Sequence, residues 1–213
     1  ASAQTADDTA EAADAEADTI AEQSDDAPPP PIGWTRRTRP VAGRDGAPLW
    51  RLLDPVIAGA DLDVLEAALA ASGVLDTWVT VDGRWLADRD GDENVATLGE
   101  PPVTPTSTLE DVCAVADDAG PVARTAAAIA RQIAVVDPGA KLPTGYPVSV
   151  SLDGRWANGH AHGRAGRSSD GAALLGASAR AAARARKISE LRQQAAGHRE
   201  TAVAARTRAK HAD

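Results

Sequence analysis

The chain has 213 residues and a formal net charge of −9, with 31 Asp and Glu against 22 Lys and Arg. Its one Cys excludes an internal disulfide, and no stretch approaches the roughly 18 apolar residues that a membrane span requires. With no Phe and one Tyr, the large side chains suffice for a single core of moderate size. Because Met is absent and no export signal begins the chain, we expect an internal piece of a longer cytoplasmic protein.

The charge is sorted along the chain. Residues 1–33 contain nine acids and no Lys or Arg, whereas residues 172–213 contain nine Lys or Arg and three acids. Residues 34–171 have 13 basic and 19 acidic side chains, a net charge of −6. This sorting indicates that the two ends of the chain recognise each other.

Residues 1–27 are predicted to form an acidic helical arm. Their apolar positions recur with alternating spacings of three and four, as in a coiled-coil seam. The helix should stop before the run of prolines that begins at Pro28, because proline cannot donate the helical hydrogen bond. The seam consists of Ala3, Ala6, Ala10, Ala13, Ala17 and Ile20.

Residues 28–48 follow as an extended entry segment rich in Pro, Gly and Arg. Three of its side chains could contact the phosphates of DNA, namely Arg36, Arg37 and Arg39.

Residues 49–171 are predicted to form one α+β domain. The apolar run 49–54 indicates a strand or a buried turn, and a helix is expected over 61–72 with Leu62, Leu65 and Leu69 on one face. Asp63 and Glu66 have capping-box spacing, and Gly73 marks the helix end. Residues 77–81 then alternate as a strand, and Asp82-Gly83 is typical of a hairpin turn.

A second set of elements resembles the first. After a linker over 99–107, Thr108 to Asp111 has capping-box spacing for a short helix containing Val112 and Val115. A longer helix is expected over 122–134 through Val122, Ala126, Ile129 and Ile133, followed by a strand with Val148, Val150 and Leu152.

The phrase VDGRW (81–85) recurs as LDGRW (152–156), each time after a helix and a strand. We interpret this as two related halves, about 49–98 and 108–157, of a pseudo-duplicated domain. The alternative is that one good hairpin sequence is used twice.

No motif in the chain identifies an enzyme. The Walker-type phosphate loop, the dinucleotide-binding glycine pattern and the nucleophile elbow are all missing from the sequence. The Asp-rich stretch 88–94 lacks the spacing of a calcium loop and indicates a solvated loop. His160 and His162 could point at one metal if they lay on a strand, but they lack a third ligand, so a Gly-rich loop is the preferred interpretation. We therefore expect no cofactor and no metal.

That loop and its flanks carry further candidates for phosphate contact, namely Arg155, Arg164 and Arg167. The acidic balance of the middle block argues against extensive DNA binding.

Residues 172–213 are predicted to form a basic helical arm that pairs with the acidic arm as an antiparallel coiled coil. Good helix formers dominate, and the 3–4 alternation continues throughout. Because the acidic arm is shorter, residues beyond about 198 should lack a partner. The alternative is that both ends are disordered tails. The seam consists of Leu174, Ala177, Ala181, Arg184, Ile188, Leu191, Ala195, His198, Ala202, Ala205, Ala209 and Ala212.

Seven short sequences occur in the chain in this order: GAPLWRLLD, LEAALAASGVLDTWV, VDGR, TLEDV, DGRW, GRAG and LLGASARAAARARKISEL. Together they resemble the central region of the SMC-like ATPase subunit of Wadjet-type, MukB-related bacterial condensins. The resemblance covers about 46–193. It implies a hinge between two coiled-coil arms, with the ATPase head made from parts of the protein outside this chain. It also implies homodimerisation through the hinge, ring closure around DNA in a complex with other condensin subunits, and defence against plasmids. The Ala-dominated first arm and the loop 158–171 depart from the family pattern.

The resemblance implies a cytoplasmic, nucleoid-associated hinge without catalysis of its own. The whole protein would trap DNA or extrude loops, for plasmid defence or for chromosome organisation and segregation. Trp85 and Trp156, one in each DGRW phrase, are candidate dimer contacts. The alternative is a DNA-binding module that acts through the Arg-rich loops, without a membrane partner in either case.

Overall fold

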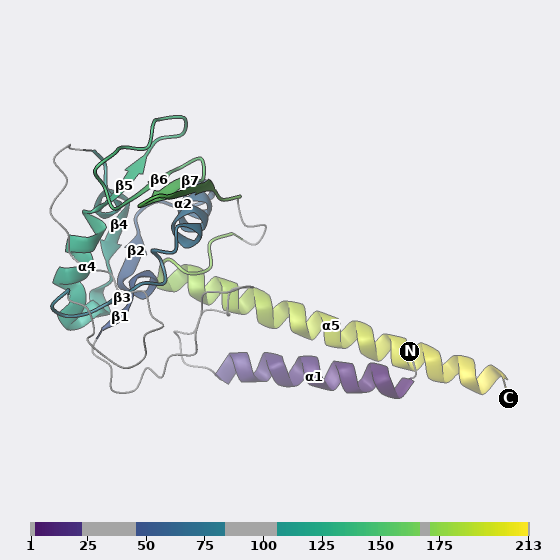
Figure 1. Ribbon diagram of the computed structural model, residues 1–213. Helices are drawn as coiled ribbons and strands as arrows, with labels where there is room; N and C mark the ends of the chain where they lie inside the picture. Colours follow the sequence, from purple (N-terminus) through teal and green to yellow (C-terminus); the bar gives the residue numbers. More distant parts are fainter. Residues whose placement is uncertain (1–2, 23–45, 84–105, 167–170, 213) are drawn as a thin grey trace. The chain divides into compact units, whose positions relative to one another are not determined.

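The computed structural model describes residues 3–22, 46–83, 106–166 and 171–212 (Figure 1). The chain has a mixed α+β fold, with five α-helices and small sheets among these residues, and α5 (Ala177–Ala212) is by far the longest helix. It divides into two compact units, Ala1–Pro29 with Arg180–Asp213, and Pro30–Ala179. The predicted borders after residues 27 and 171 lie two and eight residues from this division.

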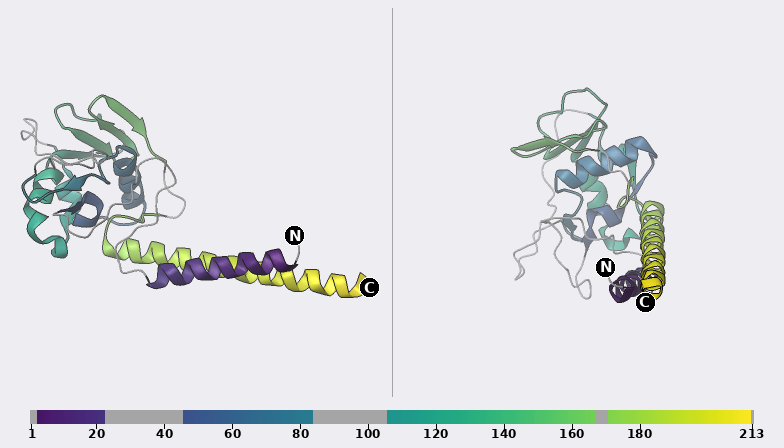
Figure 2. Two further views of the ribbon diagram at one scale, coloured as in Figure 1. Left: turned by 60° about the horizontal axis from the view of Figure 1, so that its bottom comes forward. Right: turned by 90° about the vertical axis from the view of Figure 1, so that its right-hand side faces the viewer.

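The first unit is an antiparallel pair of helices, α1 (Ala3–Glu22) and the part of α5 from Arg180 onward. The two helices lie side by side in both views of Figure 2. Asp7 is paired with Arg206 and Asp14 with Arg199, while Asp18 lies 3.6 Å from Arg192. Carboxylates at increasing positions thus meet arginines at decreasing positions, which fixes the antiparallel direction.

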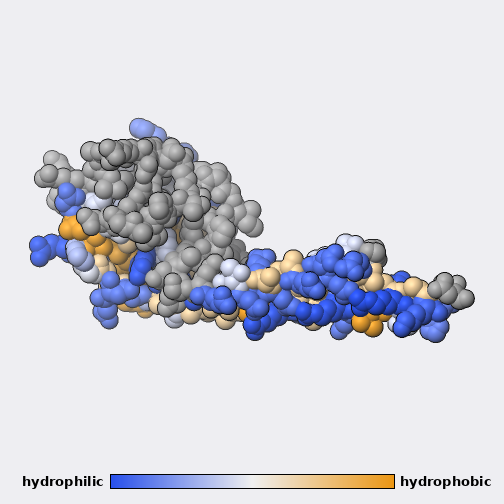
Figure 3. All heavy atoms as spheres, turned by 90° about the horizontal axis from the view of Figure 1, so that it is seen from below, coloured by the Kyte–Doolittle hydropathy of each residue, from blue (hydrophilic) through white to orange (hydrophobic). Residues whose placement is uncertain are grey.

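The burial pattern follows the predicted seam on α1. Ala6, Ala10 and Ala17 are buried, and the remaining three seam residues are half-buried. Alanine at these positions lets the two backbones approach closely, and the face of the pair seen in Figure 3 is largely hydrophilic. Among the seam positions predicted on α5, Leu191, Ala195 and Ala202 are buried.

Two predictions for the second arm are wrong. The residues expected to lack a partner lay beyond 198, but Arg199 and Arg206 are paired with α1. The reason is the charge register, because a shift of α1 by one heptad toward the start of α5 would leave Arg206 without its carboxylate. Ala177, Ala181 and Ala209, predicted in the seam, are exposed.

The expected helix start at 172 is also wrong. Residues 171–176, which we call the exit segment, precede α5 in a non-helical conformation. Gly176 has a φ of 85°, which a helix does not allow, and Leu175 is fully buried in the core of the second unit. The apolar residues at 174 and 175 therefore serve that core and not the seam.

The second unit begins with short elements around one buried helix. Strand β1 (Ala47–Pro48) pairs antiparallel with β3 (Trp78–Val79), and β2 (Leu53–Pro55) pairs antiparallel with β4 (Cys113–Val115). Between β1 and β2 lies the 3-10 helix η1 (Leu49–Leu52), so the run predicted as strand or buried turn is a turn followed by a strand. Helix α2 (Ala60–Ala71) confirms the helix predicted over 61–72 and ends before Gly73, whose φ is 78°.

The middle of this unit has shorter helices than predicted. Thr108 and Asp111 form the expected capping box on α3 (Leu109–Val112), but Val115 belongs to strand β4. The 3-10 helix η2 (Asp117–Val122) leads into α4 (Ala123–Ala130). The helix expected over 122–134 stops early, since Ile133 begins the strand β5 (Ile133–Val136), whose run Ile-Ala-Val-Val favours a buried strand.

The largest sheet has four strands in the order β5-β6-β7-β8. Its members are β5, β6 (Val148–Ser151), β7 (Arg155–Asn158) and β8 (Ala161–Arg164). Strands β5 and β6 are parallel, and β7 and β8 follow as antiparallel neighbours. Helix α2 packs against this sheet (Figure 1).

The core of the second unit joins η1, α2, α4 and the inward face of the sheet. Its fully buried side chains are mostly Leu, so aliphatic packing and not aromatic stacking stabilises the unit. The largest of them are Trp78, Leu49, Leu52, Leu53, Leu65, Leu69, Leu75, Leu109, Ile133, Leu175, Val79 and Val150.

The two DGRW phrases have different neighbours. The strand before the first phrase pairs with β1, whereas the strand before the second is the central strand β6. Residues 84 and 85 lie outside the described residues. The pseudo-duplication therefore stays a prediction.

Candidate interaction surface

The sequence NGHAHGR is not the flexible loop that was predicted, because it forms the turn and second strand of the hairpin β7–β8. Asn158 pairs with Ala161 across a two-residue turn of Gly159 and His160. Gly159 has a φ of 56°, a left-handed conformation that glycine adopts without strain. His160 therefore lies in the turn and His162 on the strand.

The two histidines form no metal site with their neighbours. Within the described ranges, no three side chains of His, Cys, Asp or Glu lie close enough together to hold a metal ion. Both imidazoles belong to exposed residues.

Arg155, a predicted phosphate contact, is occupied within the protein. Its guanidinium donates to the carboxylate of Asp153 at 2.8 Å, to the carbonyl of Ala140 at 2.8 Å and to the Ser151 hydroxyl at 3.2 Å. Asp153 also accepts the N–H of Gly139 at 3.1 Å. Through these bonds the turn between β6 and β7 holds the connection between β5 and β6 at Gly139 and Ala140.

The Arg155 guanidinium and the hydroxyl of Ser151 hold the pKa of Asp153 well below its usual range. Asp153 and Arg155 thus neutralise each other, and the net positive charge of this face comes from the strand beside them.

Trp156, a predicted dimer contact, is half-buried and packs against the core. A Cβ placed on Gly163 would lie 2.8 Å from its indole ring, so the ring covers the glycine directly. Trp156 therefore has a structural role, although the residue is only half-buried.

Arg164 is exposed, and its Nε donates to the carbonyl of Asp153 at 3.2 Å. Its register partner is Arg155 and that of His162 is Ala157, so all four residues lie on the same face of the hairpin. The remaining predicted contacts, Arg36, Arg37, Arg39, Arg167 and Trp85, lie outside the described residues, as does the Asp-rich stretch 88–94.

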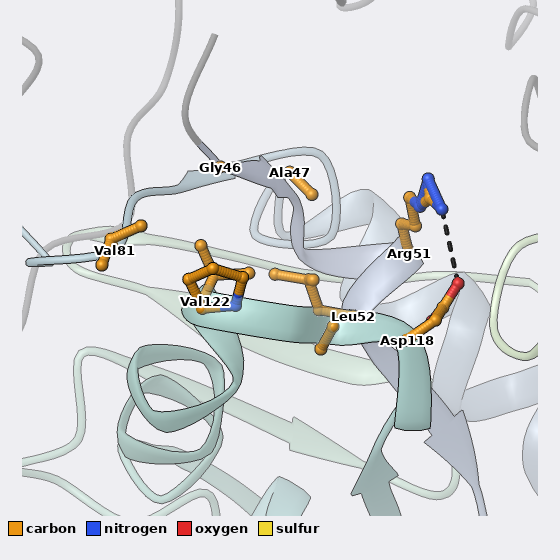
Figure 4. A pocket seen from close by; sticks show the side chains of 9 residues that line it. Gly46, Ala47, Arg51, Leu52, Val81, Asp118 and Val122 are labelled. Atoms are coloured by element: carbon orange, nitrogen blue, oxygen red, sulfur yellow. Dashed lines mark hydrogen bonds and ion pairs between the residues drawn. The ribbon is translucent and has the colours of Figure 1, made fainter.

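A shallow hollow of about 270 Å³ lies between η1 and η2. Figure 4 shows Arg51 and Asp118 pointing toward one another at one end of it, 3.4 Å apart, with apolar side chains along the rest. Arg51 and Asp118 are the charged residues among those that line this hollow, and the others are apolar. Its lining is Gly46, Ala47, Arg51, Leu52, Val81, Asp118, Ala119, Pro121 and Val122.

Cys113 is buried, and burial together with the nearby charge of Asp54 raises the pKa of its thiol to about 12. A thiol with this pKa is almost entirely protonated at neutral pH and is a poor nucleophile.

The sequence prediction missed the role of Asp63 and Glu66. These residues do not cap α2, which begins one turn earlier and has Gly59 before it. Glu66 accepts the backbone N–H groups of Ala173, Leu174 and Leu175 at 2.7, 2.9 and 2.7 Å, and Asp63 accepts that of Ala172 at 2.8 Å. The only local signal is a carboxylate on the apolar side of a helix, since Glu66 is 7% exposed.

No helix in the described parts of the chain is long and apolar enough to span a membrane. No protein family matches the chain, and no curated protein or solved structure matches it either.

Proposed function

We propose that this chain is the hinge and dimerisation module of an SMC-like condensin subunit of the Wadjet type, related to MukB. The observation that carries the proposal is the ion-paired antiparallel packing of α1 against α5, two helices from opposite ends of the sequence. A chain that leaves and returns along one arm, with a compact α+β unit between, has the layout of a hinge.

In this proposal α1 and α5 are the ends of the two strands of a long antiparallel coiled coil. The heptad spacing of Asp7 with Asp14 and of Arg199 with Arg206 supports it, because charged pairs beside an apolar seam select partner and direction. The compact unit is then a pseudo-duplicated domain that binds a second copy. The chain itself performs no catalysis.

The complete protein would be an ATPase located in the cytoplasm at the nucleoid, whose head lies outside this chain. Together with other condensin subunits it would trap DNA or extrude loops, for plasmid defence or for chromosome organisation and segregation. These assignments rest on the sequence resemblance.

Sedimentation equilibrium at several loading concentrations tests the dimerisation. We expect the mass to rise from 21.8 kDa toward twice that value as concentration increases. Trp85→Ser should weaken this association, whereas Val203→Ser, which removes an exposed apolar side chain on the outside of α5, should not. A monomer at every concentration would contradict dimerisation by this chain.

The alternative is a DNA-binding module that acts through arginine-rich loops. The exposed side chains of Arg164 and His162 favour it, while the internal bonds of Arg155 argue against a broad phosphate site. The anisotropy of a labelled DNA duplex over a salt series tests it. We expect Arg164→Ala to weaken binding and to reduce its salt dependence, with Arg131→Ala, an exposed arginine paired with Glu110, as the matched control. No binding at low salt would refute this alternative.

A further inference from the structure

Strand β8 forms an open edge of the four-stranded sheet. It pairs with β7 on one side and is the last strand in the sheet order. The opposite edge is covered, since the N–H of Val135 on β5 donates to the carbonyl of Ser107 at 2.9 Å and Thr108 bridges to Ala134. The sheet therefore has one edge that can accept a further strand.

The backbone groups that face outward at this edge belong to His162 and Arg164. The N–H of Ala165 donates to the carbonyl of Gly154 at 2.8 Å, so Gly154 and Ala165 form a hydrogen-bonded pair. Because such pairs alternate with non-bonded pairs in an antiparallel ladder, Gly163 faces β7 while residues 162 and 164 face away. No other described residue forms a hydrogen bond with the outward backbone N–H and C=O groups of His162 and Arg164.

The two faces beside the edge differ in chemistry. On one face His162 and Arg164 are exposed, and the charge of the neighbouring Arg155 is already neutralised by Asp153. On the other face Gly163 has no side chain, so the half-buried indole of Trp156 can be reached by a residue placed next to Gly163. An added strand would thus meet an arginine and an imidazole on one face and an aromatic ring on the other.

This chemistry disfavours a second copy of β8 as the occupant. In a two-fold antiparallel pairing centred on Gly163, His162 of each copy would lie directly opposite Arg164 of the other. Such a pairing would place basic residues directly opposite each other and would offer Arg164 no carboxylate, whereas opposite charges stabilise a sheet pair. Acidic side chains in the same positions would instead be attracted.

We propose that the β8 edge binds an extended segment of a partner protein in which acidic and apolar residues alternate. The acidic side chains lie beside His162 and Arg164, an apolar side chain packs against Trp156, and four backbone hydrogen bonds join the segment to residues 162 and 164. This inference goes beyond the proposed hinge, because it concerns a different partner and does not depend on dimerisation.

The test uses the full chain and an acetylated seven-residue peptide of alternating Glu and Val, with Lys in place of Glu as the control peptide. We expect saturable binding of the Glu peptide alone, measured by anisotropy of a labelled peptide. The critical comparison is His162→Pro with His162→Ala. Both remove the imidazole, but only proline removes the outward N–H, and it breaks no bond to β7 because that N–H faces solvent. We expect His162→Pro to bind about tenfold more weakly than His162→Ala.

A measurement on the unaltered protein keeps the test independent of the folding of variants. With the Glu peptide bound, the amide hydrogens of His162 and Arg164 should exchange more slowly, while those already bonded to β7 should change little. Equal binding of the two peptides, equal affinity of the two His162 variants, or unchanged exchange at 162 and 164 would overturn the inference. So would a DNA duplex that binds this edge while the Glu peptide does not.

Discussion

Replacing Glu66 should destabilise the second unit far more than replacing an exposed carboxylate on a helix would. Its carboxylate is nearly buried and accepts three consecutive backbone N–H groups of the exit segment. A hydrogen bond to a charged group contributes about 1.5–3 kcal/mol, and a buried donor left without a partner is costly. Because the three bonds share one carboxylate and are not additive, we expect Glu66→Ala to cost about 3–5 kcal/mol.

The variant Glu66→Gln separates the contributions that the two carboxylate oxygens make to this loss of stability. Oε2 accepts from Leu174 and Leu175, whereas Oε1 accepts from Ala173 alone. The amide oxygen of Gln can keep the two bonds at Oε2, which leaves its NH₂ group facing the N–H of Ala173. We therefore expect a smaller loss of about 1–3 kcal/mol, concentrated at one donor.

Urea unfolding followed by Trp fluorescence measures the total loss, and amide hydrogen exchange locates it. In Glu66→Gln the amide of Ala173 should show the largest increase in exchange. The control is Glu110→Ala, which removes an exposed ion pair with Arg131 and should cost at most about 1 kcal/mol. If Glu66→Ala were no more destabilising than this control, or if the amides of 173–175 exchanged at unchanged rates, the reasoning would be refuted.

Three further predictions concern other parts of the chain. Cys113 should react with a thiol reagent roughly a thousandfold more slowly in the native protein than in urea, because the thiol is buried and its pKa is about 12. Equal reaction rates in the two conditions would contradict this prediction. Gly154→Ala should lower the free energy of unfolding in urea by about 1–3 kcal/mol, because the φ of Gly154 is 91° and a Cβ would lie 2.3 Å from the carbonyl oxygen of Ala165. The control Gly166→Ala should change it little, since a Cβ at Gly166 meets open space. The pKa of Asp153 in the folded protein lies below its unfolded value near 3.9, so its contribution to stability is present above about pH 4 and is lost as the pH falls further. Asp153→Asn should therefore be destabilising at pH 7, and the difference in unfolding free energy between this variant and the unaltered protein should shrink in acid.

The sequence predicted local periodic structure well. The alanine spacing on α1 gave the correct buried face, because a helix repeats its environment every three or four residues regardless of what it packs against. The capping box at Thr108 was predicted correctly for a similar reason, since both partners lie within one turn. Such features depend only on residues that are neighbours in the sequence.

The antiparallel pairing of α1 with α5 was predicted from their opposite charges, but other features that depend on distant residues were not. Asp63 and Glu66 have the spacing of a helix cap, but their hydrogen-bond partners lie more than 100 residues away, at 172–175. The β7–β8 hairpin was interpreted as a loop because of its glycines, yet Gly163 is required beneath the Trp156 ring. Ile133 continued the apolar spacing of α4, and only its pairing with β6 makes it part of a strand. In each case a local pattern fits two structures, and the tertiary partner decides between them.

The packing of α1 against α5 shows how charge can determine a register that the seam leaves open. Alanine side chains are small and alike, so sliding one helix by a heptad would exchange alanine for alanine along most of the interface and change little buried area. The carboxylates at 7, 14 and 18 add a preference to this seam, because in the observed alignment they meet arginines at 206, 199 and 192. Each exposed pair contributes only about 0.5 kcal/mol. Because the three arginines are spaced by seven residues, a slip by one heptad in either direction would lose one pair and keep two. The charge pattern therefore fixes the antiparallel direction of the two helices, and it favours the observed alignment over a slip by one heptad by one ion pair.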